Sequence, residues 1–158
     1  MHATTHITKP ASRTQQSCAP AGGVRANKEK IMIKYFSDTP TLEDRAVQIW
    51  QILIGMAYNR QTATYGKIAE ILGYEGAGVL SRQLGHIMFF CAQNKIPSLT
   101  VLVVNGETGL PGEGLETKKD LHKEQENVFN CDWFSICPPT ATEFAEAYEI
   151  ARKNNWEI

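Results

Sequence analysis

Residues 64–85 read TYGKIAEILGYEGAGVLSRQLG, and this stretch decides the fold class. Thr64 is placed to cap a helix that begins at Tyr65, and Gly73 is placed to end it, because glycine readily adopts the left-handed conformation of a helix C-cap. The Gly-containing turn EGAG (75–78) then leads into a second helical pattern. Two helices joined by such a turn are typical of a helix-turn-helix. The apolar face of the first helix consists of Ile68, Ala69, Ile71 and Leu72.

The second helix of the pair covers residues 79–93, VLSRQLGHIMFFCAQ. In a DNA-binding motif, Arg82 and Gln83 would reach bases or phosphates and Ser81 would contact the backbone. The same pattern also fits a helical hairpin buried as scaffold, so both interpretations stay open. The spacing predicts a buried side of Val79, Leu80, Leu84, Ile87 and Met88, and an exposed side of Ser81, Arg82, Gln83 and His86.

The segments on either side predict a mainly α-helical fold with a small β-hairpin or wing. Upstream, TLED begins with Thr41 as a helix cap and has Asp44 in the capping-box position, so a helix should run from there to about Tyr58. Downstream, SLTVLVV (98–104) is an apolar run that we interpret as a strand, and NGETG turns the chain after it. The remaining residues are predicted to form a charged helix over 115–129, an extended segment over 131–139, and a helix over 140–156. This last helix is expected to be capped by Thr140 or Thr142, with Phe144, Tyr148 and Ile150 as candidates for burial.

Charge is distributed unevenly along the 158 residues. Residues 1–31 are polar and lack apolar periodicity, so we expect a disordered basic tail there and a single domain over 32–158. Ten of the 16 basic and 15 of the 17 acidic residues lie in 42–158, which gives that part a balance of −5. Strong nucleic-acid binders normally carry a basic face, so this balance counts against strong electrostatic binding.

Several classes of protein and site lack support in the sequence. The apolar runs are shorter than the roughly 20 residues of a membrane span, and no secretory signal is recognisable, so we expect no membrane association and a cytoplasmic location. The Gly-rich loop after Val104 lacks the GK[ST] of a phosphate-binding loop, and no GxSxG elbow occurs. We expect no metal and no cofactor, because no histidines or cysteines have the spacing of metal ligands. The residues concerned are His2, His6, His86, His122, Cys18, Cys91, Cys131 and Cys137. The cysteines are interpreted as free thiols, with Cys91 in the core.

Four motifs occur in a characteristic order: TYGKIA (64–69), EGAGVLSRQLG (75–85), VVNGETG (103–109) and EGLETKK (113–119). Together with the preceding helix, they resemble the C-terminal domain of O6-alkylguanine-DNA alkyltransferases and alkyltransferase-like proteins over roughly residues 41–125. The resemblance implies a winged helix-turn-helix-like domain that binds the DNA minor groove and flips an alkylated guanine out of the stack. It also gives Tyr65 the role of the tyrosine that rotates the target phosphate during flipping.

The chain departs from that family at the reactive motif, PCHRV. With Val103 and Val104 in register, residues 99–102 (LTVL) stand where Pro-Cys-His-Arg would lie, and Thr100 takes the position of the alkyl-accepting cysteine. Irreversible alkyl transfer needs a thiolate or an equally activated nucleophile, so we expect a protein that is not an enzyme. The family's finger arginine corresponds to Val79, and Arg82 lies one turn later.

Three hypotheses about function follow. The first is a non-catalytic, alkyltransferase-like DNA-binding protein with a role in DNA repair, which recognises modified or distorted double-stranded DNA. The alternative is a protein–protein interaction module that reuses the fold, with Trp133, Phe134 and Trp156 as anchors or as core residues. An enzyme of another type ranks last, because no nucleophile–base pair is recognisable. The predicted DNA contacts are Thr64, Tyr65, Gly66, Gly78, Ser81, Arg82, Gln83, Asn105 and Gly106.

Overall fold

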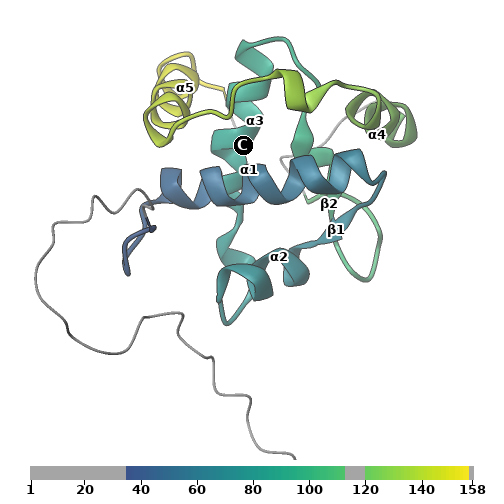
Figure 1. Ribbon diagram of the computed structural model, residues 1–158, viewed down its shortest axis with the longest axis horizontal. Helices are drawn as coiled ribbons and strands as arrows, with labels where there is room; N and C mark the ends of the chain where they lie inside the picture. Colours follow the sequence, from purple (N-terminus) through teal and green to yellow (C-terminus); the bar gives the residue numbers. More distant parts are fainter. Residues whose placement is uncertain (1–34, 113–119, 157–158) are drawn as a thin grey trace, which may run out of the picture. The chain divides into compact units, whose positions relative to one another are not determined.

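Helix α1 (Leu42–Tyr58) is the central element of the computed structural model, which describes residues 35–112 and 120–156 (Figure 1). Its start is fixed by a capping box: the Asp44 N–H donates to Thr41 Oγ1 at 3.2 Å, and the Thr41 N–H donates to Asp44 Oδ2 at 3.0 Å. The predicted cap is thus confirmed. The helix buries Ala46, Ile49, Trp50, Leu53, Ile54 and Ala57.

The two helices predicted from the TYGKIA stretch are present. Helix α2 (Tyr65–Leu72) is capped by Thr64, whose hydroxyl accepts from the Lys67 N–H at 3.1 Å, and it ends at Gly73, which has a φ of 75°. A 3₁₀ turn, η1 (Ala77–Val79), leads into helix α3 (Ser81–Gln93). Both predicted caps of α2 are therefore confirmed, since each rests on local backbone chemistry.

The predicted faces of this pair are wrong at four positions. Ile71 and Val79 were expected inside, yet they are 49% and 51% exposed. Gln83 and His86 were expected outside, yet each is only 2% exposed. Val79 is exposed because it belongs to the 3₁₀ turn that precedes α3, so it does not follow the α-helical periodicity. Gln83 and His86 are buried because α3 packs against both α1 and α5, and these contacts cover more than one side of the helix.

The predicted strand 98–104 is mostly a 3₁₀ helix. Residues Leu99–Leu102 form η2, and only Val103–Val104 form strand β2. This strand pairs in parallel with β1 (Ala63–Thr64), so among the described residues a parallel pair replaces the expected hairpin. All residues from Leu99 to Val104 are buried, and a short, continuously apolar run does not distinguish a buried strand from a buried helical turn.

The C-terminal part contains α4 (Leu121–Phe129), a 3₁₀ turn η3 (Trp133–Ser135) and α5 (Ala141–Lys153). Thr140 caps α5 in a second capping box with Glu143, which confirms one of the two predicted caps. The segment expected to be extended contains η3, and the expected burial of Ile150 is wrong, because this side chain is exposed. The predicted start of the charged helix, at 115, lies outside the described residues.

The core lies where α1 meets α3, α5 and η2. Trp50 of α1 is at its centre, and the rings of Phe90, Trp133 and Phe144 meet it edge-on at centroid distances of 5.7, 5.7 and 5.8 Å. The described residues, 35–112 and 120–156, cluster as one unit around this core. None of the described helices is long and apolar enough to cross a bilayer. The prediction of a disordered tail over 1–31 concerns residues outside the described ranges.

Candidate nucleic-acid interface

The β1–β2 pair places the start of α2 beside the loop that follows β2. Thr64 is in register with Val104, and a Cβ built on Gly106 would lie 3.7 Å from Thr64 Cγ2. Farther along the loop, the Gly112 N–H donates to the Tyr65 hydroxyl at 3.0 Å. The structure therefore brings five of the predicted contact residues into one region, which we call the loop face: Thr64, Tyr65, Gly66, Asn105 and Gly106.

The loop itself is a closed turn. The Asn105 side-chain oxygen accepts from the N–H groups of Glu107 and Thr108 at 2.8 and 3.3 Å, and the Asn105 N–H donates to the Leu110 carbonyl at 2.7 Å. Gly109 has a φ of 68°, a conformation that favours glycine. The turn predicted from NGETG is thus confirmed, and the Asn105 side chain is used in closing it.

Tyr65 is half-buried and joins α2 to the loop. Burial raises the pKa of its phenol, and the hydrogen bond from the Gly112 backbone opposes that shift in part. The phenol is therefore neutral at physiological pH. Its oxygen accepts from Gly112, and its own proton can be donated to an acceptor such as a phosphate oxygen. A Cβ on Gly112 would lie 2.6 Å from this oxygen, so a side chain at position 112 would displace the phenol or the loop.

The start of α3 forms a second exposed region. Gly78, Ser81 and Arg82 are exposed, and a Cβ built on Gly78 would meet no atom within 4 Å. The residue before the helix is Leu80, which supplies no side-chain cap, so the first N–H groups of α3 have no side-chain acceptor there. In Figure 1 this end of α3, helix α2 and the loop face all lie below α1, whereas α4 and α5 lie above it.

Gln83 does not share this exposed region, although it was predicted to contact DNA. Its Nε2 donates to the Tyr74 hydroxyl at 3.2 Å, and its Oε1 has no hydrogen-bond partner among the described residues. Arg45 of α1 lies 5.0 Å over the Tyr74 ring and donates to the Leu72 carbonyl at 3.1 Å. Gln83 is therefore part of a contact that holds the α2–α3 turn against α1. Its burial could not be predicted from the sequence, because a glutamine in a helical pattern is normally expected at the surface.

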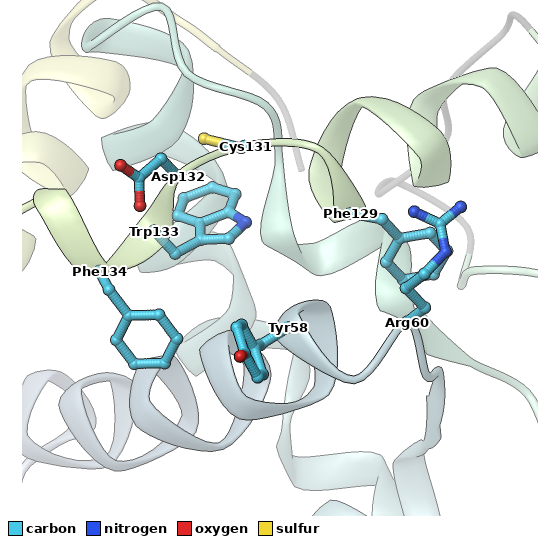
Figure 2. A pocket seen from close by; sticks show the side chains of 7 residues that line it. All are labelled: Tyr58, Arg60, Phe129, Cys131, Asp132, Trp133 and Phe134. Atoms are coloured by element: carbon cyan, nitrogen blue, oxygen red, sulfur yellow. The ribbon is translucent and has the colours of Figure 1, made fainter.

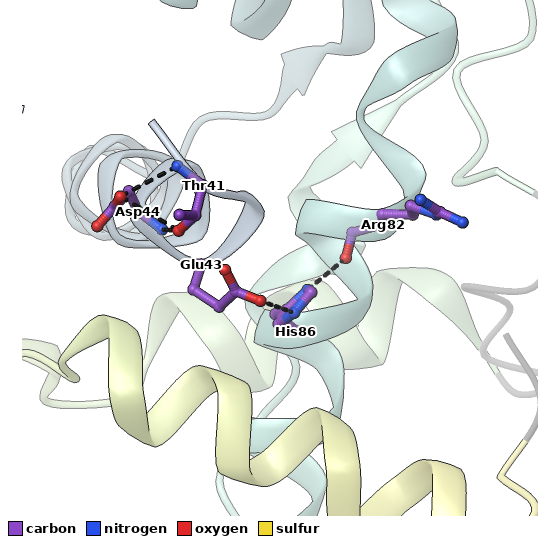
Figure 3. A network of polar contacts seen from close by, with 5 residues as sticks. All are labelled: Thr41, Glu43, Asp44, Arg82 and His86. Carbon is purple, nitrogen blue, oxygen red and sulfur yellow. Dashed lines mark hydrogen bonds and ion pairs between the residues drawn. The ribbon is translucent and has the colours of Figure 1, made fainter. Parts of the chain in front are cut away.

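His86 links the first turn of α3 to α1 (Figure 3). Its Nδ1 lies 2.7 Å from the Arg82 carbonyl oxygen, and its Nε2 lies 3.4 Å from Glu43 Oε1. Both ring nitrogens therefore face oxygen atoms of neighbouring residues. The Tyr148 ring stacks on the imidazole at 4.3 Å. Burial acts to raise the pKa of Glu43, but the Glu43 backbone, Thr41 and His86 together outweigh it and hold this pKa below its ordinary value.

The position of the family's reactive cysteine is buried. Thr100 is part of η2, and its hydroxyl lies 2.7 Å from the Ser98 hydroxyl. Cys91 is remote in sequence, yet its thiol contacts the Leu99 backbone, next to Thr100. The sequence did not predict that Cys91 lies near Thr100, because this proximity arises from the packing of α3 on η2. Burial raises the pKa of the Cys91 thiol to about 12, which leaves little thiolate at neutral pH.

The charges around the two exposed regions are mixed. Residues 64–82 and 105–112 carry two basic side chains, Lys67 and Arg82, and three acidic ones, Glu70, Glu75 and Glu107. Lys67 is paired with Glu70 at 3.0 Å. Arg82 is thus the main cation available for a phosphate. Within the described ranges, His, Cys, Asp and Glu side chains form no cluster that could hold a metal ion.

Comparisons with protein-family models, with curated proteins and with solved structures found no match to this chain.

Proposed function

We propose that this chain is a non-catalytic, alkyltransferase-like protein with a winged helix-turn-helix fold, which binds modified or distorted double-stranded DNA in the cytoplasm. The observation that carries the proposal is the exposed start of α3, with Gly78, Ser81 and Arg82 at the surface. In Figure 1 this helix begins on the side of α1 on which α2 lies.

The geometry of these groups supports contact with a DNA backbone. Arg82 supplies a guanidinium, which binds phosphate oxygens in a bidentate manner, and Ser81 supplies a hydroxyl and a helix N-terminal N–H. The neutral Tyr65 hydroxyl supplies a further donor from the loop face. Gly78 leaves room for close approach, because no atom lies near its Cβ position. Gln83 is buried beneath this surface, where it contacts Tyr74 and holds the α2–α3 turn, so it does not contact DNA in this proposal.

The chemistry around η2 supports binding without alkyl transfer. Thr100 has a hydroxyl as its hydrogen-bond partner, and Cys91 is buried with a pKa near 12. A side-chain nucleophile that accepts an alkyl group has to be ionised and reachable by the alkylated base. Binding would therefore be reversible, with the DNA unchanged.

The proposal is tested by fluorescence anisotropy of the full chain with a labelled duplex that carries one O6-methylguanine or none. We expect binding that is tighter to the modified duplex, and a salt dependence that is shallow because few cations face the DNA. Arg82→Gln should weaken binding about fivefold and lower the salt slope by about 1, because one phosphate contact is lost.

The matched control is Lys153→Gln, which removes one positive charge from the last turn of α5. This variant should bind like the wild type. The absence of binding to either duplex at low salt would contradict the proposal, and so would equal losses in the two variants.

A further inference from the structure

A groove lies between the end of α1 and the α4–η3 segment (Figure 2). Its volume is about 290 Å³, and aromatic side chains form much of its lining. Tyr58 and Arg60 line it from the side of α1, whereas Phe129, Asp132 and Phe134 line it from the other side. In Figure 1 α4 lies on the opposite side of α1 from α2, whereas the end of α1 leads into β1. None of the residues that line the groove is a proposed DNA contact.

One end of the groove already holds a guanidinium group. Arg60 follows α1 with a φ of 53°, and its guanidinium lies 5.0 Å over the Phe129 ring. Its Nη2 donates to both carboxylate oxygens of Glu126 at 2.6 Å. These hydrogen bonds hold the pKa of Glu126 below its ordinary value. The cation is therefore held by an aromatic ring below it and a carboxylate at its edge.

The other end of the groove has the same kinds of group, open to solvent. The rings of Tyr58 and Phe134 meet edge-on at 5.5 Å, and these residues are 72% and 69% exposed. Asp132 is exposed and lines the same groove. Two adjacent aromatic rings that are this exposed, in a groove that a carboxylate also lines, form a surface suited to a cation with a flat apolar face.

The local charge favours a basic partner. Over residues 120–135 the sequence contains four acidic residues, Asp120, Glu124, Glu126 and Asp132, against one lysine, Lys123. Arg60, which also lines the groove, is already paired with Glu126, so Asp132 is the acidic lining residue that is left for a partner. A nucleic-acid phosphate backbone would be repelled by this excess of acid, whereas an arginine-containing segment would be attracted.

We propose that this groove is a docking site for an arginine side chain of a partner protein. The guanidinium stacks on the rings of Tyr58 and Phe134 and pairs with the Asp132 carboxylate, as Arg60 stacks on Phe129 and pairs with Glu126. Arginine is preferred over lysine because its planar guanidinium is weakly hydrated and stacks well on aromatic rings.

The test is a ¹H–¹⁵N NMR titration of the full chain with a short Gly/Ser peptide that has one central arginine. The Trp133 indole N–H reports on the groove, because Trp133 lines it and donates to the Val128 carbonyl at 2.7 Å. We expect this signal to move while those of Trp50 and Trp156 stay in place. The lysine analogue should bind more weakly, and the glutamine analogue should leave the Trp133 signal unchanged.

Two matched pairs of variants test the assignment. Tyr58→Ala/Phe134→Ala should weaken binding about fivefold, whereas Tyr35→Ala/Phe36→Ala, which removes two other exposed rings, should not. Asp132→Asn should weaken binding, and Asp38→Asn should not. All four residues of the aromatic variants are exposed, so the fold should tolerate both, as checked by thermal unfolding.

Three results would overturn the proposal. The first is equal binding of the arginine and glutamine peptides. The second is equal weakening by the two aromatic variants. The third is movement of the Trp133 signal by a single-stranded oligothymidylate at lower concentration than by the arginine peptide, since that would make the groove a base-stacking site.

Discussion

At the scale of single residues, burial decides which potential nucleophiles can react. Cys91 and Thr100 both lie next to Leu99 in the core, and burial keeps the Cys91 thiol protonated. A thiol whose pKa is about 12 is ionised in only about one molecule in ten thousand at pH 8. The sequence placed Cys91 in the core through its apolar neighbours, but its contact with η2 depends on tertiary packing.

Iodoacetamide labelling of the native protein should therefore spare Cys91 and modify the exposed Cys137. Mass-spectrometric mapping at pH 8 measures both thiols in one sample, and labelling in denaturing urea should modify both. Native labelling of Cys91 at the rate of Cys137 would contradict the buried, protonated state of this thiol.

At the scale of elements, each capping box is a local set of hydrogen bonds, and its contribution to stability depends on pH in a predictable way. In α5, the Glu143 carboxylate accepts from the Thr140 N–H at 2.7 Å and from the Thr140 hydroxyl at 2.8 Å. The backbone hydrogen bond, followed by that of the hydroxyl, lowers the pKa of Glu143 below 4.5. Because the folded-state pKa is depressed, this stabilisation is complete above the unfolded pKa and is lost as the pH falls through the folded one.

Glu143→Gln should lower the free energy of unfolding at pH 7 and should flatten its decrease between pH 6 and acidic pH, because the variant has no carboxyl to titrate at this cap. Urea denaturation across that pH range measures both effects. Glu146→Gln makes the same chemical change on α5 outside the box, and an equal flattening in that variant would contradict the role of the cap.

The elements differ in how far they follow from sequence. The caps at Thr41, Thr64, Gly73 and Thr140 were predicted because each depends on a few neighbouring residues. The 3₁₀ helix η2 and the burial of Gln83 and His86 in α3 were not, because they depend on what packs against them. The parallel β1–β2 pair joins segments about 40 residues apart, so no local pattern encodes it.

The candidate sites follow the same division. The exposed Ser81, Arg82 and Gly78 were predicted from helical periodicity and the Gly-rich turn. The burial of Gln83 and the Glu43–His86 contact were missed, because Tyr74, Glu43 and Tyr148 approach α3 from other elements. The groove beside η3 was also missed, since Tyr58 and Phe134 are far apart in the chain.

At the scale of the whole described unit, α1 separates two surfaces of different chemistry (Figure 1). Below it in this view lie α2 and the β1–β2 pair. Arg82, in the first turn of α3, is the main available cation among residues 64–82 and 105–112, and it also lines a pocket with Tyr148 and Arg152 of α5. Above α1 lie α4 and α5. The aromatic groove is formed between the end of α1 and the α4–η3 segment. Because residues 42–158 carry more acidic than basic residues, the proposed DNA surface is expected to bind DNA through a few defined contacts rather than through a broad basic face.

The most direct test of this account is an NMR titration of the full chain with a duplex that carries one O6-methylguanine. The account predicts that the backbone amides of Tyr65, Gly78, Ser81 and Arg82 shift most, with little change in α4 and α5. Unchanged spectra at low salt, or shifts centred on α4 and α5, would contradict DNA binding through the helix-turn-helix.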